Sequence, residues 1–332
     1  MSRVSVIGAG SWGTALAKRL CENGHAVRLW CRHLELARQI NSANTNPAYL
    51  PNVLLPASLR AFSEVEEAID GAEFVLIATP SHALRTVVPG LPKLPSSVTF
   101  ISAVKGLEPQ TDLRMSQVIA ENLPGNNPIV AFSGPSLADE VARDIPTAIV
   151  AACEDLEAAR QVQALLMGPF FRVYTHVDII GVELGGALKN IIALAAGIGD
   201  GAGFGDNTKA ALITRGLVEM TRVGTYLGAD PITFAGLSGM GDLVVTCMSK
   251  KSRNRSVGEA IGRGQKLKDI LASMNMVAEG VRTTQATHAF AQKHNIELPI
   301  TRAVFEVLFE DKNPAQAVSD LMTREAKMEK FG

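Results

Sequence analysis

The first half of the chain alternates short hydrophobic runs with segments of helical periodicity. Six runs rich in Val, Ile and Phe, bounded by Gly, Pro or Asn, are typical of strands. Polar residues are scarce within these runs, which favours strands buried on both faces, as in a parallel sheet. Helical patterns lie between them, notably at residues 14–23, 136–143 and 156–166. The predicted strands are residues 3–8, 26–31, 73–79, 97–103, 128–133 and 147–152.

The pattern changes after about residue 178. Strand-like runs stop there, and amphipathic helical patterns such as KAALITRGLVEMTRVGTYLGA (209–229) take over. A chain of 332 residues is also long for a single hydrophobic core. We therefore expect an α/β, doubly wound, Rossmann-like domain with a mostly parallel sheet over residues 1–179, followed by an all-helical substrate domain over residues 180–332.

Charge and hydropathy exclude several classes of partner. The net charge is −1, with a sequence pI near 6.6, so no basic surface argues for nucleic acid. The most apolar stretch contains Glu183, Lys189 and Asp200, so we expect no integral membrane segment. The chain starts without a secretory signal, which predicts a cytoplasmic protein.

Cysteine and histidine spacing gives no metal site. The six histidines show no spacing typical of metal ligands. The four cysteines are scattered without CxxC or CxxH pairs, which excludes a disulfide framework and suits buried thiols in a reducing compartment. They are Cys21, Cys31, Cys153 and Cys247.

A glycine-rich loop follows the first predicted strand. VIGAGSWGTAL places Gly8, Gly10 and Gly13 in G-x-G-x-x-G spacing between a strand and a helix, the context of a dinucleotide-binding loop. The helix N-terminus supplies N–H donors for the phosphates. We expect Ser11 and Trp12 to lie against the dinucleotide; a tight turn without a ligand is the alternative.

The second predicted strand bears on the choice of cofactor. NAD-binding versions of this fold place an acidic residue about 20 positions after the glycines, on the ribose hydroxyls. Here the sequence is LWCRH, and Arg32 stands at that point. A guanidinium suits a 2′-phosphate, so NADP is the expected cofactor, with NAD as the second option. A solvated surface arginine remains the alternative.

One lysine lies in an almost wholly apolar helical stretch. Lys189 is flanked by Ala187, Leu188, Ile191 and Ile192 in GGALKNIIALAAG (185–197). A buried charge is costly without a partner, and most lysines in such a stretch extend to the surface. The alternative is a proton-transfer group whose pKa is lowered by its apolar surroundings.

Further polar residues follow predicted strands or begin helices. Lys105 comes just after a strand, where an anion or carbonyl could bind, and Asp242 lies amid glycines and apolar residues. Ser136, taken alone, is most simply the N-cap of the next helix. Ser252, Arg253 and Asn254 begin another helix and could bind a phosphate; a solvated basic loop capped by Asn254 is the alternative.

Together these segments resemble the bacterial type of NAD(P)-dependent glycerol-3-phosphate dehydrogenase. The resemblance rests on stretches between residues 8 and 281, of which the lysine–asparagine helix with the glycine–aspartate and SRN segments is the most specific. These stretches are GAGSWGTALA, NPAYLP, TPSHALR, AVKGLE, SGPSLADEVA, ELGGALKNIIALAAGI, GLSGMGDLVVTC, SRNR and VAEGV. Leu137, Ala48 and Met248 depart from the usual family residues, which puts only local packing in doubt.

The resemblance implies an activity and a set of site residues. It implies reversible hydride transfer between NAD(P)H and dihydroxyacetone phosphate, giving glycerol 3-phosphate for phospholipid synthesis, with Lys189 as proton donor and acceptor. The implied substrate-binding residues are Lys105, Gly134, Ser136, Lys189, Asp242, Ser252, Arg253 and Asn254. The implied cofactor-binding residues are Gly8, Gly10, Ser11, Trp12, Gly13, Arg32, His33, Tyr49, Lys105, Ala138, Arg253, Val277 and Glu279.

Two other functions stay open on the sequence. One is a dehydrogenase of the β-hydroxyacid type that acts on a carboxylated substrate; the SRN segment argues against it. The other is an NADP-binding sensor without catalysis, which would need neither Lys105 nor Asp242 beside the helical lysine. The sequence also leaves open whether the protein is a homodimer.

Overall fold

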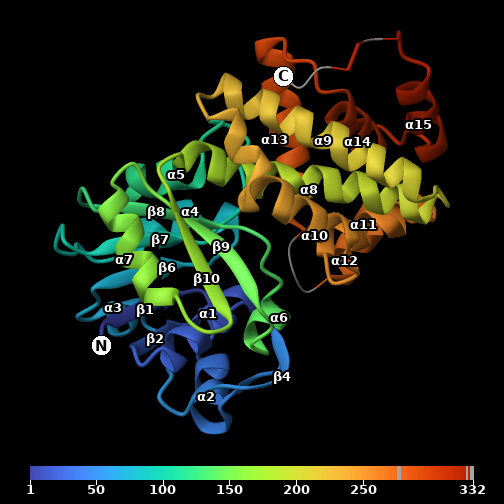
Figure 1. The fold of residues 1–332 in the computed structure, drawn as a ribbon. Helices are drawn as coiled ribbons and strands as arrows, with labels where there is room; N and C mark the ends of the chain where they lie inside the picture. Colours follow the sequence, from blue (N-terminus) through green and yellow to red (C-terminus); the bar gives the residue numbers. More distant parts are fainter. Residues whose placement is uncertain (275–277, 327, 330–332) are drawn as a thin grey trace. The chain divides into compact units, whose positions relative to one another are not determined.

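The computed structural model describes residues 1–274, 278–326 and 328–329, and the chain divides into two compact units. The first unit comprises residues 1–104 and 115–179, and the second comprises residues 105–114 and 180–332. Residues 105–114 therefore pack with the helices, although they lie inside the segment that we predicted as the first domain. Figure 1 shows the fold, coloured from blue at the N-terminus to red at the C-terminus.

The first unit contains the strands and seven α-helices. The strands are β1 (Arg3–Ile7), β2 (Ala26–Trp30), β3 (Thr45–Asn46), β4 (Leu50–Leu54), β5 (Arg60–Phe62), β6 (Phe74–Ile77), β7 (Thr99–Ser102), β8 (Ile129–Ser133), β9 (Thr147–Ala152) and β10 (Phe171–His176). The helices are α1 (Ser11–Glu22), α2 (Leu34–Ala43), α3 (Val65–Ile69), α4 (Leu84–Val87), α5 (Met115–Asn122), α6 (Ala138–Ala142) and α7 (Leu156–Leu166).

An eight-stranded sheet forms the centre of the first unit, in the order β10-β9-β8-β7-β6-β1-β2-β5. The six strands from β5 to β8 have the 3-2-1-4-5-6 order of a dinucleotide-binding domain. All neighbours are parallel except β8 and β9, so the predicted Rossmann-like, mostly parallel sheet is confirmed. All six predicted strands exist; β5, β10 and the small β3–β4 sheet were not predicted.

The turn from β1 into α1 depends on two glycines that approach each other closely. A Cβ atom at Gly13 would lie 1.9 Å from the carbonyl oxygen of Gly8, which no side chain could tolerate without a shift of the helix. Gly8 has φ +118°, and a Cβ there would lie 2.9 Å from the carbonyl oxygen of Ala78. The two glycines therefore let the helix start directly against β1 and β6.

The second unit is helical. Its helices are α8 (Ile179–Gly201), α9 (Asp206–Tyr226), α10 (Asp242–Met248), α11 (Arg253–Gly262), α12 (Leu267–Ser273), α13 (Glu279–His294), α14 (Pro299–Phe309) and α15 (Pro314–Met322). Their buried side chains form one hydrophobic cluster, to which α8 contributes Leu184, Leu188, Ile191, Ile192 and Leu194 among others.

Helix α8 is mostly apolar, and its apolar side chains belong to the core of the helical unit (Figure 1). Among the described residues, it is the one helix that is long and apolar enough to cross a membrane by length and composition. The charged residues of this stretch led us to expect no membrane segment. Within the structure, 89% of its most apolar window is buried, as in the core helix of a globular domain. The four cysteines are buried as free thiols, as predicted.

The close approach at Gly13 gives a first test of the fold. Gly13→Ala should lower the free energy of unfolding by about 1–3 kcal/mol, because the added methyl group meets the Gly8 carbonyl. Gly90→Ala is the matched control: a Cβ there would meet no heavy atom within 4 Å among the described residues. Urea denaturation measures both variants; equal stability losses would contradict the packing described for Gly13.

Candidate active site

The glycine-rich loop lies where β1 ends and α1 begins, next to the point at which strand order reverses in the sheet. Open α/β sheets bind ligands at such a point. Gly10 occupies the N-cap of α1 and, having no side chain, leaves the first N–H groups of the helix uncapped by its own residue. A Cβ at Gly10 would meet nothing within 4 Å in the described chain, which leaves space for a pyrophosphate at the helix end.

A neighbouring segment fixes the shape of this loop. The hydroxyl of Ser11 donates a hydrogen bond to the carbonyl oxygen of Tyr49 at 2.5 Å. The buried amide of Asn46 donates to the carbonyl oxygen of Ala9 at 2.9 Å and to the hydroxyl of Thr14 at 2.8 Å. The NPAYLP stretch thus braces both sides of the loop. Sequence reasoning missed Asn46, although the resemblance included its segment.

Arg32 and His33 follow β2 on the same edge of the sheet. Both are exposed, and the Arg32 guanidinium lies 3.2 Å from the Nε2 atom of His33. His33 is the N-cap of α2, so a phosphate near Arg32 would also lie near a helix N-terminus. The glycines, Arg32 and the α1 N-terminus thus fit a phosphorylated dinucleotide.

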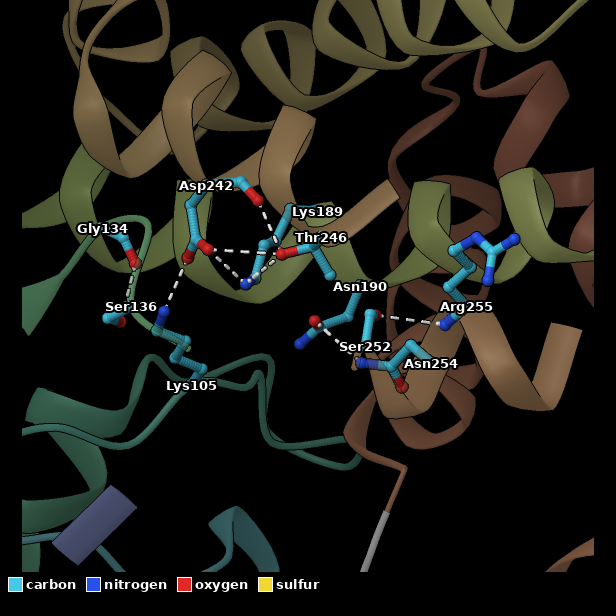
Figure 2. A network of polar contacts seen from close by, with 10 residues as sticks. All are labelled: Lys105, Gly134, Ser136, Lys189, Asn190, Asp242, Thr246, Ser252, Asn254 and Arg255. Atoms are coloured by element: carbon cyan, nitrogen blue, oxygen red, sulfur yellow. Dashed lines mark hydrogen bonds and ion pairs between the residues drawn. The ribbon is translucent and has the colours of Figure 1, made fainter. Parts of the chain in front are cut away.

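Lys189 is buried in the middle of α8, with a relative exposure of only 7%. Its ammonium donates to Oδ1 of Asp242 at 2.5 Å and to the hydroxyl of Thr246 at 2.7 Å. Lys105 donates to the other oxygen of Asp242, Oδ2, at 2.6 Å. Two lysines therefore share one carboxylate that is itself 1% exposed (Figure 2).

The close packing of α8 against the start of α10 brings these groups together. A Cβ at Gly185, one turn before Lys189, would lie 2.5 Å from the carbonyl oxygen of Ser238. Ser238 belongs to a π-helical turn (Leu237–Gly241) that leads directly into Asp242. Only a glycine allows the helix to approach this turn so closely, and π-helical turns are frequent at functional sites. The glycine before Lys189 thus lets the turn that leads into Asp242 pack directly against α8.

The surroundings of Lys189 favour its neutral form. Burial lowers the pKa of its ammonium from the ordinary 10.5 to about 8. Asp242 opposes this by attracting the charge, whereas the neighbouring cation of Lys105 lowers the pKa further. A lysine with a pKa near 8 can both give and take a proton close to neutral pH.

A second polar cluster lies at the start of α11. Ser252 is the N-cap of this helix, and its hydroxyl accepts from the backbone N–H of Arg255 at 3.2 Å. The buried amide of Asn254 donates to Oδ1 of Asn190 at 2.9 Å and accepts from the N–H of Gly280. Asn190 is the residue after the buried lysine, so α8 carries both clusters.

The two arginines of the SRNR stretch differ in their surroundings. Arg255 is buried, and it pairs with Asp200 at 2.6 Å and with Glu259 at 3.1 Å, which gives it a structural role. Arg253 is exposed at the first turn of α11, where a guanidinium and a helix N-terminus coincide. This end of the helix suits an anion such as a phosphate.

The remaining predicted site residues lie as follows. Gly134 and Ser136 belong to the first unit, and the Ser136 hydroxyl donates to the Gly134 carbonyl oxygen at 2.9 Å. Our expectation that Ser136 caps the next helix is wrong, because Leu137 is the N-cap and Ala138 is the first residue of α6. Glu279 begins α13. Val277 lies outside the described residues.

Sequence reasoning missed three polar residues of the helical unit's clusters: Thr246, Asn190 and the acidic residue Glu183. Thr246 stands four residues after Asp242, a spacing that places both on one helix face, and this signal was available. Glu183 forms a 2.5 Å ion pair with Arg114. No local signal links these two residues, because they lie 69 positions apart.

Comparison with known proteins agrees with this architecture. Residues 3–159 and 178–319 match the N-terminal and C-terminal parts of the family described as NAD-dependent glycerol-3-phosphate dehydrogenase. The glycerol-3-phosphate dehydrogenases (NAD(P)+) of Lysinibacillus sphaericus and Bacillus cytotoxicus are 50% and 52% identical over 332 residues, covering 99% of this chain and 98% and 97% of those proteins.

A solved structure agrees over the whole length. The crystal structure of glycerol-3-phosphate dehydrogenase from Coxiella burnetii has a TM-score of 0.93 and 40% identity, covering 97% of this chain and 99% of that chain. Full-length identity of this order, with both parts of the family matched, leaves one conclusion. The chain belongs to the NAD-dependent glycerol-3-phosphate dehydrogenase family and is an NAD(P)-dependent oxidoreductase.

Proposed function

We propose that this enzyme interconverts dihydroxyacetone phosphate and sn-glycerol 3-phosphate, with NADP as the preferred cofactor, in the cytoplasm, where the product would serve phospholipid synthesis. The observation that carries the proposal is the buried cluster in which Lys189 and Lys105 share the carboxylate of Asp242. Such a cluster is costly to bury and gives a proton-transfer group beside a second cation.

Lys189 is the proposed proton donor and acceptor. When bound, the nicotinamide supplies or accepts the hydride, and the protein must manage one proton at the substrate oxygen. The protonated lysine donates to the carbonyl oxygen of dihydroxyacetone phosphate as that oxygen becomes a hydroxyl. In the reverse direction the neutral lysine removes the proton from the same hydroxyl.

The neighbours of Lys189 orient its ammonium and adjust its pKa. Thr246 and Asp242 hold the ammonium in one orientation through the hydrogen bonds described above. Lys105 lowers the pKa of Lys189 and offers a second positive charge to the developing oxyanion. The fixed positive charges cost no reorganisation during the reaction, because the buried carboxylate already holds them in place.

Binding of the substrate phosphate is assigned to the start of α11. Arg253, Ser252 and Asn254 stand there together with the positive end of the helix dipole. Binding energy from the phosphate, remote from the reacting carbon, can position the carbonyl for hydride transfer. Gly134 and Ser136 of the first unit are further proposed substrate contacts.

The cofactor is assigned to the glycine-rich loop, with Gly8, Gly10 and Gly13 shaping the turn. Arg32 would hold the 2′-phosphate of NADP, with His33 beside it. The other proposed cofactor contacts are Ser11, Trp12, Tyr49, Lys105, Ala138, Arg253, Val277 and Glu279. A carboxylated substrate is the second candidate. The anion site at Arg253 lies on a helix N-terminus, where the positive charge suits a phosphate as well as a carboxylate. A phosphate offers more acceptor oxygens to the N–H donors there.

The direct test of the proposed activity is nicotinamide absorbance with dihydroxyacetone phosphate and each reduced cofactor. Absorbance should fall with both cofactors, and faster with NADPH. A carboxylated β-keto acid serves as the control substrate. Oxidation of neither cofactor by dihydroxyacetone phosphate would contradict the proposal.

Removal of the proposed acid and base should stop turnover without affecting cofactor binding. Lys189→Met should lower kcat by about 10²–10⁴-fold, the usual contribution of general acid–base catalysis. Asp242 keeps a partner in Lys105, so the fold should persist. NADPH affinity, measured by fluorescence titration, should be unchanged. Retained turnover would exclude Lys189 from the proton-transfer role.

The pH dependence should follow the titration of Lys189. Reduction needs the protonated lysine, so its kcat should fall as pH rises past about 8, whereas oxidation should rise over the same range. Asp242→Asn removes the carboxylate that raises this pKa, so both limbs should move to lower pH. Rates should be measured between pH 7 and 10, because the substrate phosphate titrates at about pH 6 and does not contribute in that range. A shift to higher pH would contradict the assignment.

The choice of cofactor should depend on Arg32. Arg32→Asp should lower kcat/KM for NADPH by about 10–100-fold, the value of one or two charge-assisted hydrogen bonds, and should improve use of NADH. Arg160→Asp is the control, because Arg160 is an exposed arginine of α7 in the same unit. An unchanged NADPH-to-NADH ratio in Arg32→Asp would remove this residue from the 2′-phosphate site.

A further inference from the structure

Residues 105–114 form a closed loop with its own hydrogen bonds. Leu107 and Arg114 pair as an antiparallel bridge, and the N–H of Glu108 donates to the carbonyl oxygen of Leu113 at 3.0 Å. Asp112 turns the chain with φ +60°, and its N–H donates to the carbonyl oxygen of Glu108. Lys105 stands at the start of this loop and Arg114 at its end.

Besides the Lys105–Asp242 pair, several other contacts hold the loop on the helical unit. Leu107 is 2% exposed and belongs to the hydrophobic cluster of that unit. Lys293 of α13 contacts the carboxylate of Asp112 at 3.2 Å on the surface. Arg114 donates to the carboxylate of Glu183 on α8 at 2.5 Å, with 5% of the Glu183 side chain exposed.

Loss of the Arg114–Glu183 pair should cost more free energy than loss of the surface pair Lys293–Asp112. Surface pairs contribute little, and the Lys293 side chain is 66% exposed. In the Arg114–Glu183 pair only 14% and 5% of the side chains are exposed, so removing one partner leaves a poorly compensated charge, which is unfavourable. The Arg114–Glu183 pair is thus the contact that fixes where the loop closes.

Helix α8 therefore carries both Lys189 and, six residues earlier, the partner of the loop that presents Lys105. We propose that Glu183 and Arg114 are positioning residues, which dock the 105–114 loop so that the Lys105 ammonium meets Asp242 beside Lys189. This role deepens the proposed function and rests on it. Neither residue touches the reacting atoms; both act through Lys105.

Docking of the loop should also affect the titration of Lys189. The groups that face its ammonium are Asp242, Thr246 and Cys247 of α10 and Lys105 of the loop. Burial lowers the pKa of Lys189 most, and Lys105 is the described neighbouring charge that lowers it further, whereas Asp242 and Cys247 raise it. A loop that docks less firmly should therefore allow this pKa to rise.

The test uses two variants that break the pair from opposite sides, Glu183→Gln and Arg114→Gln. Each should lower kcat about tenfold or more, since small misplacements of a catalytic group have large effects on rate. Each should also move the alkaline limb of dihydroxyacetone phosphate reduction to higher pH, in the same direction as Lys105→Met. If one variant does not fold, the other carries the test. Arg114→Lys, which keeps the charge, should retain the wild-type pH profile.

Two comparisons separate positioning from a merely structural role. Asp200→Asn removes another carboxylate of α8, 13% exposed and paired with Arg255 and Lys209, and should lower stability without moving the pH limb. In a Lys105→Met background, Glu183→Gln should add no further shift, because its effect passes through Lys105. A further shift in that background, or an unmoved limb in both single variants, would overturn the proposal. Failure of the proposed function itself would show instead as turnover retained by Lys189→Met.

Discussion

The candidate active site of the helical unit depends on one buried carboxylate. Asp242 is almost wholly removed from solvent, and each of its two oxygens accepts a hydrogen bond from a different lysine. A buried carboxylate is tolerated only when its charge is compensated, and the lysines need the carboxylate for the same reason. Burial lowers the pKa of Lys189 to about 8 despite the attraction of Asp242, and the positive charge of Lys105 lowers it further.

The backbone around this carboxylate is arranged to make the contact possible. Gly185 lets α8 approach the π-helical turn that precedes Asp242, and α10 then places Thr246 one turn further along the same face. On the other side, the 105–114 loop leaves the chain of the first unit after Val104 and packs with the helices. Because α8 belongs to the hydrophobic cluster of the helical unit, Lys189 is buried, and this burial lowers its pKa.

The sequence predicted the fold class well because buried strands and amphipathic helices have distinct hydrophobic periods. It failed for β10 and β5, whose exposed positions carry residues such as Arg172, Tyr174 and Arg60, so that neither has the continuous apolar run of a central strand. These strands lie at the two edges of the sheet, where burial is incomplete.

The grouping of Lys105 and Asp242 beside Lys189 was predicted from the sequence, but the individual contacts within the cluster were not. Lys189, Lys105 and Asp242 could each be singled out as a polar residue in an apolar segment, and the structure brings all three together. Thr246 was recoverable from helical spacing, whereas the Arg114–Glu183 pair depends on a loop that packs with a unit other than the one suggested by its position in the chain. The Ser136 prediction failed because the helix begins two residues later, after Leu137.

Lys189 is a buried lysine whose pKa is lowered by burial and by Lys105 and raised by Asp242. A direct titration tests it: NMR of protein labelled with ¹³C at the lysine side chains, followed from pH 6 to 11, with Lys189→Met to assign the resonance. The Lys189 signal should titrate with a midpoint near 8, and this midpoint should rise in Lys105→Met. A midpoint at the ordinary lysine value of about 10.4 in the wild-type protein would contradict the account.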